Sequence, residues 1–378
     1  MKYFLLILAL FLPKFLSAHV LQENGPFYEF ENVYFNPNKE LLAFPTDKTH
    51  AMRSFLWHPM RISPDQTRRK KDLLSKKVHK WDGTTLLLAD SSSGFLTHYF
   101  HFLEHLLGIW QFGGAQAAEQ VRHIIFCSQE NTLRPLSWKG VNHINEKIIK
   151  ALFPKAKVHT LYDLRKHKKK SIFCQKMILS SRIQSYHLPL CTSINKMLGA
   201  SWKDLSQPSM ESLRQTILSS LQVTTLPAAE KLRITYVKRH PPRALTPELE
   251  EALIQSIETK TGIPVHRVDF AAISFEDQLR IVANTDVLIG VHGNGLSHIV
   301  FLPPSATVFE LFPSTGFTWD YALLSKIRNL DYYGHTVNGW VTSEEDPHTS
   351  SFHCFGNLNH VVDEVDIDSI VEIIRKKS

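Results

Sequence analysis

Short apolar runs alternate with amphipathic segments along most of the chain. In the second half the runs "LRITYVKR", "IPVHRVDF", "TDVLIGV" and "TVFELF" are rich in β-branched residues, which is typical of strands buried on both faces. The segments between them carry helix-start signals, such as Thr246 before Pro247 and Ser274 further along. Strands that alternate with helices in this way predict an α/β fold with a parallel sheet and helices on both faces.

The first half shows the same alternation less regularly. "TTLLLAD", "VRHIIFCS" and "IFCQKMILSSR" predict strands, whereas "FLTHYFHFLEHLLGIWQF", "NHINEKIIKALFP" and "SMESLRQTILSSLQV" predict helices. The aromatic piece "PFYEFENVYF" predicts an edge strand or a wrapping loop, and the basic run from Arg68 to Lys80 predicts a solvated face. Because "TTLPAAE" has the composition of a linker, we expect one domain over residues 19–225, a second over residues 226–362, and a C-terminal helix over residues 363–378.

The first residues differ from the rest of the chain. Lys2 precedes an apolar run from Tyr3 to Leu12, which ends at Pro13, and Leu16-Ser17-Ala18 resembles a cleavage site for signal peptidase. The run is well short of the ~20 residues that span a bilayer. We therefore interpret residues 1–18 as a signal peptide for the secretory pathway, with a short uncleaved anchor as the alternative.

Composition narrows the class of protein. The 378 residues are 43% hydrophobic and 21% charged, as in an ordinary globular protein of two domains. The net charge of +7 is not accompanied by anything that resembles a nucleic-acid module. The four cysteines show no C-x-x-C spacing, so one or two disulfides are possible in an oxidising compartment, whereas a cysteine zinc site is not expected.

The most informative stretch is "TDVLIGVHGNGLSHIVFLPPSATVFELFP", from Thr285 to Pro313. Its pattern predicts a strand, a glycine turn at His292-Gly293-Asn294-Gly295, an apolar helix that stops at a proline pair, and a second strand that contains Glu310. Glycines at such a turn allow a ligand to approach the backbone, and the free N–H groups of the helix start attract anions, phosphates above all. Tight strand-to-helix turns also need glycine for geometry alone.

The string "GVHGNGLSHIVFLPP", with "VFELFP" after it, closely resembles the signature of glycosyltransferase family 61. This sequence departs from the family pattern at Asn294, where alanine is usual, and at Ser297-His298, where Thr-Asn is usual. The departures lie beside the expected nucleotide site and bear on the donor more than on the family. The resemblance covers roughly Leu86 to Pro313 and is strongest in the second half.

Two further blocks support the resemblance. "ITYVKRHPPRAL" resembles a strand-then-arginine block of the family, in which Arg239 and Arg243 match its arginines. "THYFHFLEHLL" resembles its H-[FW]-x-[DE] block, in which His101 and Glu104 match. An arginine at a strand end can chelate phosphate oxygens through its planar fork.

The resemblance implies a GT-B-type fold, with two Rossmann-like domains that face a cleft. It implies inverting transfer of a sugar from a UDP-sugar donor to a hydroxyl of a protein or glycan, on the lumenal side of the endoplasmic reticulum or Golgi. Animal members of the family transfer N-acetylglucosamine to proteins and plant members add xylose or arabinose; we favour N-acetylglucosamine. No metal and no cofactor other than the donor are expected.

The same resemblance assigns roles to residues. An acceptor hydroxyl that attacks the sugar must lose its proton, and His101 and Glu104, three positions apart on one helix, are both candidates for the base. Glu310 is expected to accept hydrogen bonds from the ribose hydroxyls. The donor nucleotide and diphosphate site is expected to comprise Arg239, Arg243, His292, Gly293, Asn294, Gly295 and Glu310.

Two other functions fit parts of the sequence. His101-Phe102-Leu103-Glu104-His105 matches H-x-x-E-H, the zinc-ligand pattern of one class of metallopeptidase. That function would leave the block from His292 to Pro313 without a purpose. The second alternative is a glycan-binding relative that has kept the fold and lost catalysis.

Overall fold

The computed structural model describes residues 19–24, 27–37, 41–43, 61–63, 78–90, 96–128, 143–166, 171–180, 210–227 and 229–378. The predicted signal peptide and most of the basic run from Arg68 to Lys80 lie outside these residues. Contacts divide the chain into two compact units. The first comprises residues 1–96, 119–141 and 155–181, and the second comprises residues 97–118, 142–154 and 182–378. This division differs from the contiguous halves expected from the sequence, because two helical segments of the first half belong with the C-terminal residues.

The first unit contains an eight-stranded mixed sheet in the order β4-β3-β2-β8-β5-β6-β7, with β1 paired to β2. Strands β8, β5, β6 and β7 run parallel to one another, and β2 runs antiparallel to β8. The expectation of an edge strand or loop for "PFYEFENVYF" is wrong, since β2 pairs with β8 on one side and with β3 on the other. The elements of this unit are β1 (His19–Asn24), β2 (Phe27–Asn36), β3 (Leu41–Ala43), β4 (Arg61–Ser63), β5 (His79–Asp90), β6 (Val121–Ser128), β7 (Lys157–Thr160), α9 (Leu161–Lys166) and β8 (Ile172–Ser180).

Two cysteines belong to the apolar core of this sheet. Cys127 and Cys174 are buried thiols outside any disulfide, and they pack with Phe30, Trp81 and Leu87. Burial raises the pKa of the Cys174 thiol to about 12. Cys354, in the second unit, is disulfide-bonded, so the four cysteines form at most one disulfide.

The second unit contains a six-stranded sheet in the order β10-β9-β11-β12-β14-β15. The first five strands are parallel, and β15 is antiparallel to β14. In chain order the parallel strands therefore run 2-1-3-4-5, and the direction of winding reverses between β9 and β11. Ligands of such sheets bind outside the carboxyl ends of the strands at this switch point. The strands are β9 (Ile234–Val237), β10 (Val265–Val268), β11 (Val287–Val291), β12 (Thr307–Leu311), β14 (Asp331–Thr336) and β15 (Gly339–Thr342), with the small pair β13 (Gly316–Phe317) and β16 (Phe355–Gly356) outside the sheet.

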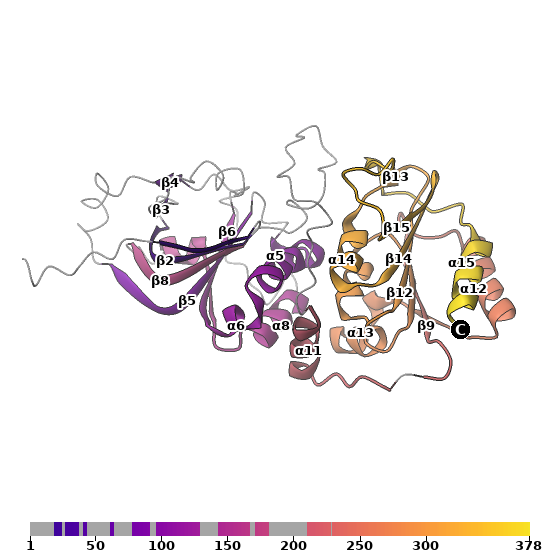
Figure 1. The fold of residues 1–378 in the computed structure, drawn as a ribbon, viewed down its shortest axis with the longest axis horizontal. Coiled ribbons are helices and arrows are strands. Elements are labelled where there is room, and N and C mark those ends of the chain that lie inside the picture. The colour runs from indigo at the N-terminus through magenta and orange to yellow at the C-terminus, as the bar shows by residue number, and fades with distance from the viewer. Residues whose placement is uncertain are drawn as a thin grey trace, which may run out of the picture. The chain divides into compact units, whose positions relative to one another are not determined.

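Helices cover both faces of this second sheet, as the sequence predicts. Helices α13 and α14 lie against one face, and α12 and α15 lie against the other (Figure 1). Helix α5 contacts the segment η3 at the carboxyl edge of the sheet, and α8 is joined to α13 by the ammonium group of Lys147, which donates to the Glu276 carboxylate at 2.6 Å. The helices are α5 (Tyr99–Phe112), α6 (Gly114–Glu119), α8 (His143–Leu152), α11 (Met210–Ser220), α12 (Pro247–Thr261), η2 (Phe270–Ala272), α13 (Phe275–Val282), η3 (Asn294–Phe301), α14 (Asp320–Arg328) and α15 (Ile367–Lys377).

An α/β fold with mainly parallel sheets is thus confirmed, whereas two domains facing a cleft stay a prediction. None of the helices within the described ranges has the length and apolar character needed to cross a membrane.

The helix boundaries follow from local side-chain chemistry. The Thr246 hydroxyl accepts from the Leu249 N–H at 3.2 Å and begins α12, and Gly262 ends it in the left-handed conformation at φ 70°. Ser274 begins α13 in the same way, with its hydroxyl 3.1 Å from the Asp277 nitrogen. These contacts satisfy N–H groups that a helix start leaves unpaired, and both predicted caps are confirmed.

The helix predicted after the glycine turn is a 3₁₀ segment, η3, over Asn294–Phe301. Two buried arginines hold its C-terminal end. Arg214 of α11 donates through Nε to the Phe301 carbonyl at 2.8 Å, and Arg328 of α14 donates through Nη2 to the Leu302 carbonyl at 3.0 Å. Both guanidinium groups also pair with Glu211, so α11 and α14 fix the segment that follows the glycine turn.

We predict that Arg214→Met lowers the free energy of unfolding by about 2–4 kcal/mol, because it leaves the buried Phe301 carbonyl without its donor and Arg328 with a poorer set of partners. Urea unfolding of the purified chain measures the change. Lys260→Met is the matched control, since its ion pair with Asp368 is exposed and is worth about 1 kcal/mol or less. A loss at Arg214 no larger than that of the control would show that the buried arginine does not hold η3.

Candidate active site

The site is centred on the close approach of Arg239 to Gly293. These residues follow β9 and β11, the two strands at the switch point. Gly293 has φ 145°, and a Cβ atom added there would lie 1.9 Å from Nη1 of Arg239. Glycine is needed at this position both for the backbone angle and because any side chain would displace the guanidinium group.

The positive charge of this edge is not neutralised by the protein. Arg239 has no hydrogen-bond or ion-pair partner among the residues that the structure describes, and Arg243 donates through Nε to the neutral amide oxygen of Asn359 at 2.8 Å. Burial lowers the pKa of Arg239, and the nearby Arg243 lowers it further, although a guanidinium group stays protonated at neutral pH. Two adjacent cations that lack a carboxylate partner, above the N-terminal end of η3, form a site for an anion.

A buried network supports the turn from below. His292 Nδ1 lies 2.6 Å from Oε1 of Glu310, and the Tyr332 hydroxyl donates to Oε2 of Glu310 at 2.6 Å. Glu310 is completely buried, which raises its pKa well above the ordinary range, while burial lowers the pKa of His292 to about 4. Burial therefore disfavours the charged form of each group, and the hydrogen bonds tie the ends of β11, β12 and β14 together.

This arrangement bears on the role expected for Glu310. Both of its carboxyl oxygens are hydrogen-bonded inside the protein, and its side chain is not exposed. A ribose hydroxyl cannot reach it in this structure. The interaction instead orients the His292 ring beneath the anion site.

His101 and Glu104 form a second pair on α5. Nδ1 of His101 lies 2.8 Å from Oε2 of Glu104; the His101 side chain is 21% exposed, whereas that of Glu104 is 0% exposed. A carboxylate in this position holds the proton of the imidazole on Nδ1 and leaves the lone pair on Nε2. The buried Glu104 is thus suited to orient the ring, and the partly exposed His101 is suited to meet a substrate.

Tyr321 of α14 joins the two parts of the site. Its ring lies 5.1 Å from that of Phe100 on α5 and 5.3 Å from that of His292. Its hydroxyl is also hydrogen-bonded to Ser297 of η3. The pair on α5 and the anion site therefore lie on either side of one buried tyrosine, in the same compact unit.

The preceding residue, Asp320, adds a carboxyl group to the same cluster. It is mostly buried, which raises its pKa. His292 and His101 lower this pKa, whereas the nearby Glu104 raises it. The sequence analysis missed both Asp320 and Tyr321. Acidic residues are common at helix starts because they interact favourably with the helix dipole. The sequence "TWDYALL" therefore does not indicate a functional site.

The other predicted residues of the turn, Asn294 and Gly295, make contacts within the protein. The Asn294 side-chain oxygen accepts from the Ser297 hydroxyl at 3.1 Å, which places the family departure at Asn294 within the turn. A Cβ atom at Gly295 would lie 3.1 Å from Cγ1 of Val237, so Gly295 is required for packing against β9. All predicted site residues belong to the second unit.

The structure does not support the zinc-ligand interpretation of H-x-x-E-H. Among the side chains that the structure describes, no three histidine, cysteine, aspartate or glutamate residues converge as metal ligands would. His101 is turned toward Glu104, and His105 is completely buried.

Comparison with known proteins identifies the family. The model of the family described as Glycosyltransferase 61 matches residues 99–309, which is more than half of the chain. The chain belongs to the glycosyltransferase 61 family. The resemblance seen in the sequence is confirmed. Asp320, Tyr321 and Tyr332 lie beyond the matched residues, although they complete the site.

Individual relatives carry more specific names. The chain is 41% identical over 132 residues to the EGF domain-specific O-linked N-acetylglucosamine transferase of Drosophila melanogaster, a match that covers 35% of this chain and 25% of that protein. The proteins of the same name from Xenopus laevis and Bos taurus are each 36% identical over 121 residues, which cover 31% of this chain and 23% of theirs. The matched stretch is thus about a quarter of each relative.

His298, the second departure from the family pattern, generates a prediction about pH. Its Nδ1 donates to the Gly295 carbonyl at 3.1 Å, and its ring packs against the rings of Tyr99, Phe270 and Phe275. Burial lowers its pKa from 6.5 to about 4. Below pH 6.5 the His298 ring is therefore protonated in the unfolded chain but stays neutral in the folded chain. The free energy of unfolding falls as the pH drops from 6.5 toward 4.

We expect His298→Asn to remove this part of the pH dependence. Between pH 6.5 and 4.5 the wild type should lose stability relative to the variant by up to about 1.4 kcal/mol per pH unit. Urea unfolding at pH 7, 6 and 5 measures the difference, with replacement of the exposed His266 of β10 as the control. A wild-type-to-variant difference that stays constant with pH would contradict the assignment of a neutral, buried His298.

Proposed function

We propose that the chain is an inverting glycosyltransferase that transfers N-acetylglucosamine from a UDP-sugar to a hydroxyl of a protein or glycan in the secretory pathway. One observation carries the proposal. The Arg239 guanidinium group lies against Gly293 at the switch point, with Arg243 near it and no carboxylate paired to either among the described residues, and the same compact unit holds His101, which the buried Glu104 orients.

The arginines suit the leaving group of such a reaction. When the bond between the sugar C1 and the diphosphate breaks, negative charge grows on the diphosphate oxygens, and preorganised donors that face those oxygens lower the barrier. Arg239, Arg243 and the N–H groups at the start of η3 supply such donors from the protein itself. We accordingly propose that no metal is needed and that the nucleotide sugar is the only other group bound.

The histidine suits the acceptor. The acceptor oxygen attacks C1 from the face opposite the diphosphate, its proton passes to Nε2 of His101, and UDP departs with the bonding electrons. Glu104 holds Nδ1 in the protonated tautomer and stabilises the imidazolium group that forms. His101 is therefore proposed as the base and Glu104 as its positioning residue.

The proposed identities of the sugar, the acceptor and the compartment have weaker support than the proposed reaction. The three relatives named above are O-linked N-acetylglucosamine transferases by name, but the match covers about a quarter of each, and Asn294 differs from the usual residue of the family. Xylose and arabinose are therefore the sugars to test next. The disulfide at Cys354 suits an oxidising lumen.

We predict that His101→Ala lowers kcat for sugar transfer about 100-fold or more, since positioned proton acceptors contribute about 10²–10⁴-fold, and leaves the Kd of UDP within about twofold. Added imidazole should restore part of the rate by entering the vacated space. Glu104→Gln should lower kcat less, about tenfold, because a neutral amide still occupies the position. Transfer from UDP-N-acetylglucosamine, UDP-xylose and UDP-arabinose to an EGF-domain acceptor measures the rate, and titration with UDP measures binding.

The outcomes separate the candidate functions. Normal transfer by His101→Ala would remove His101 as the base, and equal loss of UDP binding and stability would make α5 a structural helix. UDP binding without transfer from any donor by the wild type would favour the inactive glycan-binding relative. Absence of UDP binding, with stability that falls on chelation and returns with zinc, would contradict the whole proposal.

A further inference from the structure

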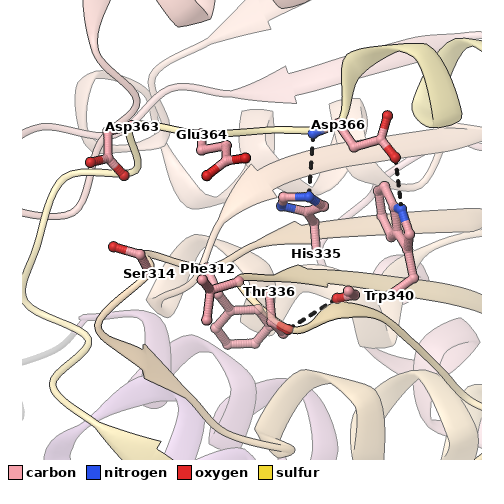
Figure 2. Close-up of a pocket in the computed structure, with 10 residues that line it drawn as sticks. Phe312, Ser314, His335, Thr336, Trp340, Asp363, Glu364 and Asp366 are labelled. Carbon is pink, nitrogen blue, oxygen red and sulfur yellow. Dashed lines mark hydrogen bonds between the residues drawn. The ribbon is translucent and has the colours of Figure 1, made fainter.

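A pocket opens at the carboxyl ends of β12 and β14, next to the site described above. Its volume is about 160 Å³, and its lining includes Phe312, Ser314, His335 and Trp340 (Figure 2). Phe312 connects the two places, because its ring also stacks on that of His292 at 5.4 Å. Nothing in the proposed transfer of a sugar uses this pocket.

His335 presents an unused hydrogen-bond donor there. Its Nε2 accepts from the backbone N–H of Asp366 at 3.3 Å, which places the ring proton on Nδ1. Partial burial also lowers the pKa of His335. That Nδ1 atom is shielded from water and has no hydrogen-bond partner. In Figure 2 it faces away from Asp366, on the side where Glu364 lies. A buried donor without an acceptor is unfavourable, so a ligand oxygen at this point would stabilise the pocket.

Acceptors line the opposite side. Asp363 and Glu364 are exposed carboxylates without hydrogen-bond partners in the described part of the chain, and the Ser314 hydroxyl lies at the rim. The negative charge disfavours phosphate and other anions. A cation would pair with the carboxylates but could not accept a hydrogen bond from His335. In the described ranges, no three metal-ligating side chains converge.

The size of the pocket and its aromatic surface limit the class of ligand further. The volume of about 160 Å³ leaves room for a ligand of the size of a single sugar ring. Trp340 is fixed by its indole N–H, which donates to Asp366 at 3.3 Å, and by edge contact with His335 at 4.9 Å. A rigid aromatic side chain beside paired donors and acceptors suits a molecule with an apolar face and a hydroxylated edge.

We propose that this pocket, lined by Phe312, His335, Trp340 and Glu364, binds one neutral sugar residue of a glycan. His335 Nδ1–H donates to an oxygen of the sugar, and Asp363 and Glu364 accept from its hydroxyl groups. Because the pocket adjoins the site of transfer through Phe312, the sugar belongs either to the acceptor glycan or to the product that has just been extended. The assignment concerns binding, so it does not depend on the identity of the transferred sugar.

The experiment uses the full chain and simple glycosides. Saturation-transfer NMR and calorimetry are carried out with the methyl glycosides of N-acetylglucosamine, mannose, glucose and xylose, in the presence of saturating UDP. At least one should bind, and His335→Phe should weaken it at least tenfold because the ring is kept and the donor is lost. Glu364→Gln, an exposed change that does not threaten folding, should weaken it severalfold.

The controls separate this proposal from the transferase proposal. The exposed His266 of β10 is replaced as the matched histidine control and should leave glycoside binding unchanged. UDP affinity should be the same in all variants, since the pocket lies outside the anion site. Absence of binding by every glycoside, or equal binding by wild type, His335→Phe and Glu364→Gln, would overturn the sugar pocket and leave the transferase proposal intact. Tighter binding of methyl glucuronide than of the neutral glycosides would also overturn it, because the carboxylates should repel that anion.

Discussion

The contact between the Arg239 guanidinium group and the backbone of Gly293 is the constraint on which the rest of the site depends. It needs a residue without a side chain after β11 and an arginine after β9, and it needs these two strands to be neighbours. The strand order of the second unit meets the last condition, because its winding reverses between β9 and β11. The fold therefore brings together two segments that lie more than fifty positions apart in the chain and places an unneutralised charge over an open backbone.

Burial disfavours charge on the residues that lie beneath this arginine. Charged forms of His292 and Glu310 would each be costly in the completely buried space that they share. The burial raises the pKa of one and lowers that of the other, and Tyr332 completes the hydrogen bonding. Both carboxyl oxygens of Glu310 are hydrogen-bonded to His292 and Tyr332, so Glu310 does not pair with the arginines. The guanidinium groups consequently remain available for the diphosphate of a substrate.

Local signals of the sequence predicted the fold well, and long-range contacts explain the errors. Caps such as Thr246 and Ser274, and the glycine turn at His292-Gly293, depend on residues a few positions apart, and each is found where it was expected. The interior position of β2 depends on pairing with β8, far along the chain, and cannot be read from its own residues. The same applies to α5, whose sequence predicts a helix but not that it belongs with the C-terminal unit.

The residues of the candidate site also fall into two groups, those that the sequence predicts and those that only tertiary packing places. Motif residues such as Arg239, Gly293 and His101 were predicted because the family pattern marks them. Asp320 and Tyr321 were missed because only tertiary packing brings α14 beside α5 and His292. The sequence also does not show that both carboxyl oxygens of Glu310 are hydrogen-bonded inside the protein, and its contact with a ribose stays a prediction.

The most direct measurement is the calorimetric affinity for UDP of wild type, Gly293→Ala and Gly262→Ala, each after exhaustive chelation. Gly262 also has a positive φ, but a Cβ atom there meets no atom within 4 Å, so this control reproduces backbone strain without disturbing an arginine. The account predicts metal-free binding by wild type, a loss of at least tenfold in Gly293→Ala, and wild-type affinity in Gly262→Ala. Equal affinity in Gly293→Ala and wild type, or binding that requires added metal, would contradict it.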